Sequence, residues 1–210
     1  MPGTATVSTT ASKPMQMTLP PSFAHRPRTG GFGWSHGGSV SLVIAAQNPN
    51  LAGRMFLYEP SLTTFCEDAE QLKSVTEDRD AAFGGAAPFA QKGDFAGALR
   101  AALDGVHDKP GFFDSLPHAI RTMCSDNVRT MPLSAAPLIT PADLRAIAIP
   151  VEICFGSDTR SFFKTIARTA AELLPAAKAR SVEGAFHLWP ALEDQGFSSL
   201  LREFLDSTRD

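Results

Sequence analysis

Residues 33–38 of the chain read Gly33-Trp34-Ser35-His36-Gly37-Gly38, and the interpretation of the whole sequence starts from this stretch. It contains the pattern Gly-x-Ser-x-Gly, which is typical of a nucleophile elbow, a sharp turn between a strand and a helix. Glycines two positions before and two positions after the serine leave room for the chain and the helix start to approach closely. The pattern also occurs in ordinary Gly/Ser loops, so the rest of the chain has to decide between the two.

The residues that follow the serine favour the elbow. Residues 39–46 form an apolar run without glycine or proline, which suits a buried helix, and Asn48 and Pro49 then end it. Residues 51–58 read as a short buried strand that ends at Glu59. A helix between a turn and a buried strand is the arrangement expected of an α/β protein.

Alternation of strand and helix resumes in the C-terminal third. The segment from about residue 63 to residue 146 is helical and interrupted by prolines, with a helix start at Thr140. After it we expect a strand at 147–156, an amphipathic helix at 161–174, a short strand at 179–183 and a closing helix over 197–204. Strands and helices that alternate on both sides of a helical insertion imply a parallel sheet with crossover connections.

The composition limits the classes of function. Hydrophobic residues make up 43% and charged residues 20%, and the net charge of −3 gives no electrostatic case for nucleic acid or an anionic membrane. No apolar run approaches the roughly 18 residues of a membrane span. The widely spaced cysteines Cys66, Cys124 and Cys154 favour reduced thiols in a cytoplasmic setting over a disulfide frame or a zinc site. The histidines show no metal-ligand spacing, so we expect no metal and no other cofactor.

Residues 1–30 differ in composition from the rest of the chain. Residues 1–28 are rich in Thr, Ser and Pro and contain no Asp or Glu, and the first acidic residue of the chain is Glu59. They lack the apolar core of a secretory signal. We therefore expect a disordered segment over residues 1–30 and a folded domain over residues 31–210.

Together, these motifs resemble those of the α/β-hydrolase fold family over residues 33 to about 205. The resemblance rests on the elbow, on Leu57-Tyr58-Glu59-Pro60, on residues 150–158 and on Gly184-Ala185-Phe186-His187, which matches the Gly-x-x-His loop of such enzymes. It implies a mostly parallel α/β sheet with a helical cap inserted at about 63–146.

The resemblance also implies roles for individual residues. In this family a nucleophile, an acid and a histidine follow one another along the chain. Ser35 matches the nucleophile and His187 matches the general base. The backbone N–H of His36, which follows the nucleophile, matches one donor of the oxyanion hole.

Two carboxylates compete for the position of the acid. Asp158 follows the strand that ends at Gly156, which is the commoner location, although the usual Gly-x-x-Asp spacing would place the acid at Thr159. Glu59 ends the strand after the elbow helix, where some haloalkane dehalogenases of this fold keep their acid. The commoner location favours Asp158, and Glu59 stays the alternative.

The resemblance does not include the N-terminal strands that this family normally has before the nucleophile. Four or five strands normally precede the elbow, including an apolar strand into the serine and a His-Gly loop that supplies the second oxyanion donor. Residues 20–31 begin with two prolines and are not expected to form a central apolar strand. We therefore expect a partial hydrolase that lacks its N-terminal strands, exposes a sheet edge and has weak activity or none.

The function that the resemblance implies is a serine hydrolase acting on a carboxylic ester or lactone through an acyl-enzyme. Two alternatives stay open: a non-catalytic hydrolase remnant that binds a partner or ligand, and a cofactor-free haloperoxidase-like member with the same triad. The expected partner is a small-molecule ester or a related substrate, with no nucleic acid and no membrane. The sequence does not indicate an oligomeric state.

Overall fold

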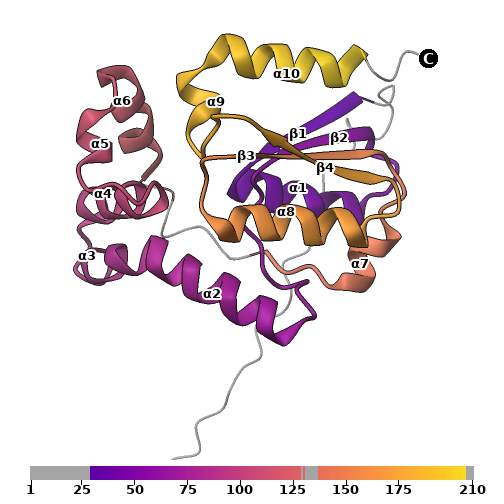
Figure 1. Ribbon diagram of the computed structural model, residues 1–210, viewed down its shortest axis with the longest axis horizontal. Helices are drawn as coiled ribbons and strands as arrows, with labels where there is room; N and C mark the ends of the chain where they lie inside the picture. The colour runs from indigo at the N-terminus through magenta and orange to yellow at the C-terminus, as the bar shows by residue number, and fades with distance from the viewer. Residues whose placement is uncertain (1–28, 129, 131–136, 207–210) are drawn as a thin grey trace, which may run out of the picture.

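A four-stranded sheet forms the centre of the computed structural model, which describes residues 29–128, 130 and 137–206 (Figure 1). The strands lie in the order β1-β2-β3-β4, and all three neighbouring pairs are parallel. Their bounds are Thr29–Trp34 for β1, Ala52–Tyr58 for β2, Val151–Gly156 for β3 and Ala177–Val182 for β4. The expected α/β architecture with a parallel sheet is therefore confirmed.

The strand that leads into Ser35 lies at the edge of the sheet, so it agrees with the expectation that residues 20–31 form no central apolar strand. Thr29–Trp34 forms β1, as the turn at Ser35 requires, and pairs with β2 in a register that sets Phe32 beside Phe56. Parallel pairing uses backbone groups, so a glycine-rich segment can join the sheet when a neighbouring strand offers its free edge. Thr29 and Gly30 thus belong to the sheet, whereas the disorder expected for residues 1–28 lies outside the described part of the chain.

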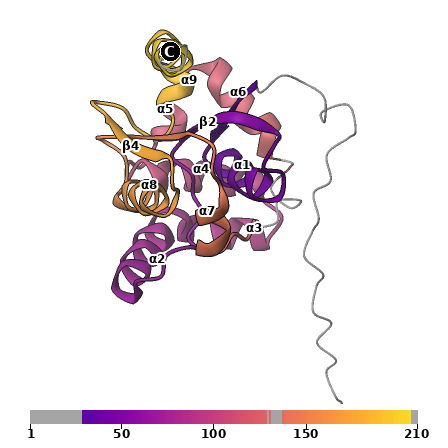
Figure 2. The same ribbon diagram turned by 90° about the vertical axis from the view of Figure 1, so that its right-hand side faces the viewer.

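Helices cover both faces of the sheet, as the two perpendicular views show (Figures 1 and 2). On one face lie α1 (His36–Gln47), α7 (Pro141–Ala146) and α8 (Ser161–Leu173), and on the other lie α9 (Trp189–Leu192) and α10 (Asp194–Asp206). Successive side chains of β2 point to opposite faces of the sheet. Leu57 belongs to the core cluster on the α1 and α8 side, whereas Phe56 and Tyr58 pack with Phe197 and Phe204 of α10.

A group of helices is inserted between β2 and β3 and stands beside the sheet, at the left in Figure 1. Its members are α2 (Ala69–Phe83), the 3₁₀ helix η2 (Gly84–Ala86), α3 (Ala87–Gln91), α4 (Phe95–Val106), α5 (Phe112–Ser115) and α6 (His118–Asn127). We call these elements the cap. The helix expected to start at Thr140 is α7, which has a complete capping box and packs against α1 and α8.

Within the described ranges, no helix is both long enough and apolar enough to cross a membrane.

Candidate active site

Ser35 occupies the turn between β1 and α1 in a backbone conformation that few residues adopt. Its φ is 53° and its ψ is −124°. Its N–H donates to the carbonyl oxygen of Tyr58 at 2.9 Å, and its own carbonyl oxygen accepts from the N–H of Ser39 at 3.1 Å. A serine with positive φ is uncommon, and such strained residues cluster at functional sites. The expected strand–turn–helix is therefore present, with the serine at its apex.

The glycines around Ser35 are not equally required. A Cβ atom on Gly33 would lie 2.6 Å from the Ser41 Oγ and 2.7 Å from the Gly38 Cα, so no side chain fits there. A Cβ atom on Gly38 would lie 3.3 Å from the Cβ of Pro60, whereas one on Gly37 would meet nothing within 4 Å. The close approach after the serine thus occurs at Gly38, one residue later than the sequence pattern suggested.

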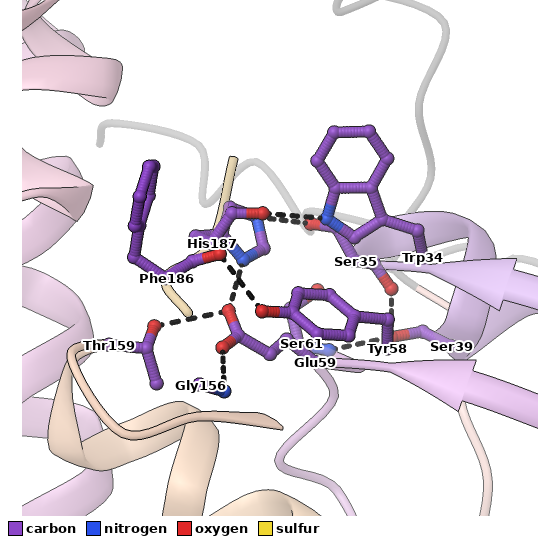
Figure 3. A network of polar contacts seen from close by, with 10 residues as sticks. All are labelled: Trp34, Ser35, Ser39, Tyr58, Glu59, Ser61, Gly156, Thr159, Phe186 and His187. Atoms are coloured by element: carbon purple, nitrogen blue, oxygen red, sulfur yellow. Dashed lines mark hydrogen bonds and ion pairs between the residues drawn. The ribbon is translucent and has the colours of Figure 1, made fainter. Parts of the chain in front are cut away.

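His187 lies in the loop after β4, and its side chain reaches Ser35 at the carboxyl end of the sheet (Figure 3). Its Nε2 is 3.0 Å from the Ser35 Oγ. The imidazole is buried and stacks on the ring of Phe163, with 4.2 Å between centroids. The resemblance assigned the nucleophile to Ser35 and the base to His187, and the structure brings the two side chains into hydrogen-bond contact.

Two aromatic side chains at strand ends fix the backbone of the histidine loop. The indole Nε1 of Trp34 donates to the carbonyl oxygen of His187, and the hydroxyl of Tyr58 donates to that of Phe186, each at 3.0 Å (Figure 3). Burial, and then the charge of Glu59, raise the pKa of Tyr58, so its hydroxyl stays protonated and remains a donor. The sequence analysis predicted neither of these two hydrogen bonds.

Glu59 is the carboxylate that contacts His187. It directly follows β2, has a φ of 46° and is fully buried. Its Oε2 lies 2.7 Å from the His187 Nδ1 and accepts from the Thr159 hydroxyl at 3.1 Å, and its Oε1 accepts from the Gly156 N–H at 2.8 Å. Both oxygens therefore have partners, and the carboxylate needs no water to satisfy it.

Asp158 does not join this group, which corrects the preference for it drawn from the sequence. Its side chain is exposed, and its Oδ1 accepts from the Ser157 hydroxyl at 2.9 Å. Asp158 comes two residues after Gly156 instead of three, so the usual position of the acid is taken by Thr159, which is buried. Thr159 in turn donates a hydrogen bond to Glu59. The sequence contained a signal for Glu59 as the acid, because a threonine stands where the family usually has its aspartate.

The protonation pattern of the site follows from its donors and acceptors. A carboxylate can only accept, so Glu59 draws the imidazole proton to Nδ1 and leaves Nε2 free to accept from the Ser35 hydroxyl. His36 is the first residue of α1, so its N–H lacks an intrahelical acceptor and lies at the positive end of the helix dipole. The dipole of α1 therefore favours negative charge near this N–H.

One cavity of the cap lies apart from this group of residues. Among residues 29–128, 130 and 137–206, no three His, Cys, Asp or Glu side chains are grouped so that they could hold a metal ion. A cavity of about 690 Å³ lies in the cap, and its lining includes Asp94, Arg100 and Phe113 but none of Ser35, Glu59 and His187. The chemistry therefore has to be read from the hydrogen-bonded group at the strand ends.

No protein-family profile matches the sequence, and no curated protein is significantly similar to it. Solved structures do match. The carboxylesterase CesB (YbfK) from Bacillus subtilis is 17% identical, with a TM-score of 0.59 over 86% of this chain and 60% of that one. The serine hydrolase CCSP0084 from Cycloclasticus zankles is 14% identical, with a TM-score of 0.59 over 87% of this chain and 65% of that one. MenH from S. aureus is 20% identical, with a TM-score of 0.58 over 87% of this chain and 70% of that one.

The chain thus spans 60% and 65% of the length of the first two of these proteins. At such identities the likeness concerns architecture, and it agrees with the parallel sheet, the elbow at Ser35 and the inserted cap. The chain has the α/β-hydrolase fold.

Proposed function

We propose that this chain is a serine hydrolase acting on a carboxylic ester or lactone, with Ser35 as nucleophile, His187 as general base and Glu59 as acid. One observation carries the proposal: an unbroken line of short contacts runs from the Ser35 Oγ through His187 to Glu59, at 3.0 and 2.7 Å. Nucleophile and base within hydrogen-bond reach, with the base oriented by a third group, is the arrangement that nucleophilic catalysis requires.

The reaction follows from these positions. The Ser35 Oγ attacks the carbonyl carbon of the ester while the His187 Nε2 takes the hydroxyl proton. The negative oxygen of the tetrahedral intermediate accepts a hydrogen bond from the His36 N–H. The C–O bond to the leaving group then breaks as His187 returns the proton to the departing oxygen. Water, deprotonated by the same imidazole, releases the acid and restores Ser35.

Glu59 holds the imidazole rather than exchanging protons with it. Its contact with Nδ1 keeps the reactive Nε2 turned toward Ser35 and stabilises the imidazolium that forms during attack. The Gly156 N–H and the Thr159 hydroxyl keep the carboxylate in place. The names of two neighbours, a carboxylesterase and a serine hydrolase, are compatible with this chemistry, and the substrate class is part of the proposal.

A fluorophosphonate probe tests the proposal at the level of a single reaction step. The Ser35 Oγ is expected to attack phosphorus and displace fluoride, and intact-mass measurement should show one adduct per chain. Ser35→Ala should abolish the adduct, whereas Ser41→Ala should retain it, because the Ser41 hydroxyl donates to the Gly37 carbonyl oxygen of the same helix and not to the site. Labelling that survives Ser35→Ala, or no labelling of the folded wild-type chain, would contradict the proposal and favour a protein that only binds.

Turnover is the second measurement. Release of p-nitrophenol from p-nitrophenyl acetate should depend on Ser35 in the same way. A burst of product equal to the protein concentration would indicate an acyl-enzyme.

A further inference from the structure

His107 carries an unusual nitrogen. In the part of the chain that the structure describes, its Nε2 is the one buried side-chain nitrogen or oxygen without a hydrogen-bond partner. Native proteins leave few such atoms unpaired, because each one loses its hydrogen bond to water without gaining another. The atom therefore calls for a partner that arrives from outside the protein.

The place of His107 links the cap to the active site. The residue caps the C-terminus of α4, its ring stacks on Phe112 with 3.7 Å between centroids, and it meets the ring of Phe186 edge-on at 5.4 Å. Phe186 directly precedes His187 in the loop of Figure 3. Trp34 packs into the same apolar cluster as Phe112 and Phe186. His107 is thus separated from the catalytic loop by a single aromatic ring.

The turn that presents His107 is anchored on both sides. Arg160 donates to the carbonyl oxygen of Gly105 at 2.9 Å and pairs with Asp108 at 3.6 Å. Asp108 has a φ of 48°, and the other non-glycine residues with positive φ in the described chain are Ser35 and Glu59. The backbone beside His107 is therefore held in an uncommon conformation, as it is at two of the three residues of the proposed triad.

The imidazole of His107 is neutral under physiological conditions. Burial, reinforced by the nearby His187, lowers its pKa to about 3. A neutral imidazole offers one donor and one acceptor. It can hydrogen-bond a neutral hydroxyl group without either partner carrying a charge.

We propose that His107 is a substrate-recognition residue, whose Nε2 hydrogen-bonds a hydroxyl group on an aromatic acyl moiety that packs beside Phe112 and Phe186. The inference rests on the proposed function of Ser35 and specifies its substrate class. An aromatic ring matches the aromatic surroundings, and its hydroxyl supplies the partner that Nε2 lacks.

Arylboronic acids test the inference, because they add to an activated serine and place their ring where an acyl group would lie. The probes are phenylboronic acid and its ortho-, meta- and para-hydroxy isomers, with affinities measured by calorimetry. We expect one isomer to bind the wild-type chain at least about fivefold more tightly than the parent, the range of one neutral hydrogen bond. His107→Phe should remove this preference, His107→Gln should retain part of it, and His118→Phe, on exposed α6, should leave it unchanged.

The outcomes separate the inference from the proposed function. Binding of all four probes at Ser35 with equal affinity would overturn the inference and leave the hydrolase assignment standing. Absence of any adduct at Ser35 would overturn both. Should His107→Phe not fold, imidazole ¹⁵N spectra of the wild-type chain decide. The Nε2 resonance of His107 is expected to shift with the preferred isomer and not with phenylboronic acid, and an unchanged resonance would overturn the inference.

Discussion

The strand-end site and the cap differ in whether a buried ionisable side chain has all of its hydrogen-bond partners. Glu59, at the end of β2, has hydrogen-bond partners on both carboxylate oxygens, all supplied by the chain itself. His107, in the cap, has a buried nitrogen with none. The proposed triad thus has its hydrogen-bond partners within the chain, whereas the cap holds one buried nitrogen for which we propose a substrate hydroxyl as the partner.

Packing shows the same contrast. Every residue of β3 is buried, whereas α3 and α6 bury none of theirs. Burial of apolar surface is the dominant favourable contribution to folding, so the sheet layers supply most of the stability. The cap should therefore tolerate change that the strand ends do not, and four pairs of substitutions compare the two regions.

The largest effect is expected at the two carboxylates. Glu59→Gln should slow fluorophosphonate labelling by about 10² to 10⁴-fold, because an amide no longer holds the imidazole in the reactive tautomer. Asp158→Asn is the matched control and should leave the rate within about twofold, since its side chain is exposed. Pseudo-first-order labelling rates measure both. A larger loss for Asp158→Asn would reverse the assignment of the acid.

The second largest effect is expected on stability, at Gly156, where β3 lies close to the loop that carries His187. A Cβ atom on Gly156 would lie 1.9 Å from the carbonyl oxygen of Ala185, so Gly156→Ala should lower the free energy of unfolding by about 1–3 kcal/mol or more. Gly37→Ala meets nothing within 4 Å inside α1 and should raise it by up to about 1 kcal/mol. Urea denaturation compares the two variants. Equal stabilities would show that the strand ends can relax as freely as a surface helix.

The third test concerns the contact between α2 of the cap and the start of α8, which packs on the sheet. The Asp78 Oδ1 accepts from Arg160 at 3.0 and 2.6 Å and its Oδ2 accepts from the Phe162 N–H at 2.9 Å, so Asp78→Asn should cost about 1–3 kcal/mol of stability. Its neighbour Glu77 lies 3.9 Å from Lys73, and both side chains are exposed. Glu77→Gln should therefore change the unfolding free energy by less than about 0.5 kcal/mol. Similar losses of unfolding free energy in the two variants would mean that the contact between α2 and α8 contributes no more stability than a surface ion pair.

The smallest expected effect is the loss of folding stability at acidic pH that His107 causes. The pKa of His107 is about 3 in the folded chain and ordinarily 6.5, so the unfolded chain binds the proton first as the pH falls. Stability should be lost between pH 6.5 and pH 3, by on the order of 1 kcal/mol from pH 7 to pH 5 once partial solvent screening is allowed for. His107→Phe should remove that part of the pH dependence, and His118→Phe should not. An unchanged slope in His107→Phe would show that the imidazole is charged or solvated in the folded chain.

Local sequence patterns predicted the parts of the fold and site that depend on near neighbours. The turn at Ser35, the helix behind it, the strands on either side of the insertion and the histidine loop all follow from residues within a few positions of one another. Gly33 was also identified correctly, because its role depends on the first turn of α1.

Features that depend on distant contacts could not be predicted in this way. β1 has three glycines and no apolar alternation, and it is a strand because β2 pairs with it. The competition between Glu59 and Asp158 is decided by which residue after β3 is buried, and that residue is Thr159, which donates to Glu59. His107 had no signal at all, because the burial of its Nε2 arises from the packing of its ring against Phe112 and Phe186.

The positive φ angles of Ser35 and Glu59 have an evolutionary consequence. Values of 53° and 46° suit glycine, and each such conformation costs a non-glycine residue about 1–3 kcal/mol of stability. At Ser35, whose side chain makes one hydrogen bond, selection for stability alone would favour glycine. A lineage of this chain that no longer needed the chemistry would drift in that direction, and its melting temperature would rise as the active site decayed.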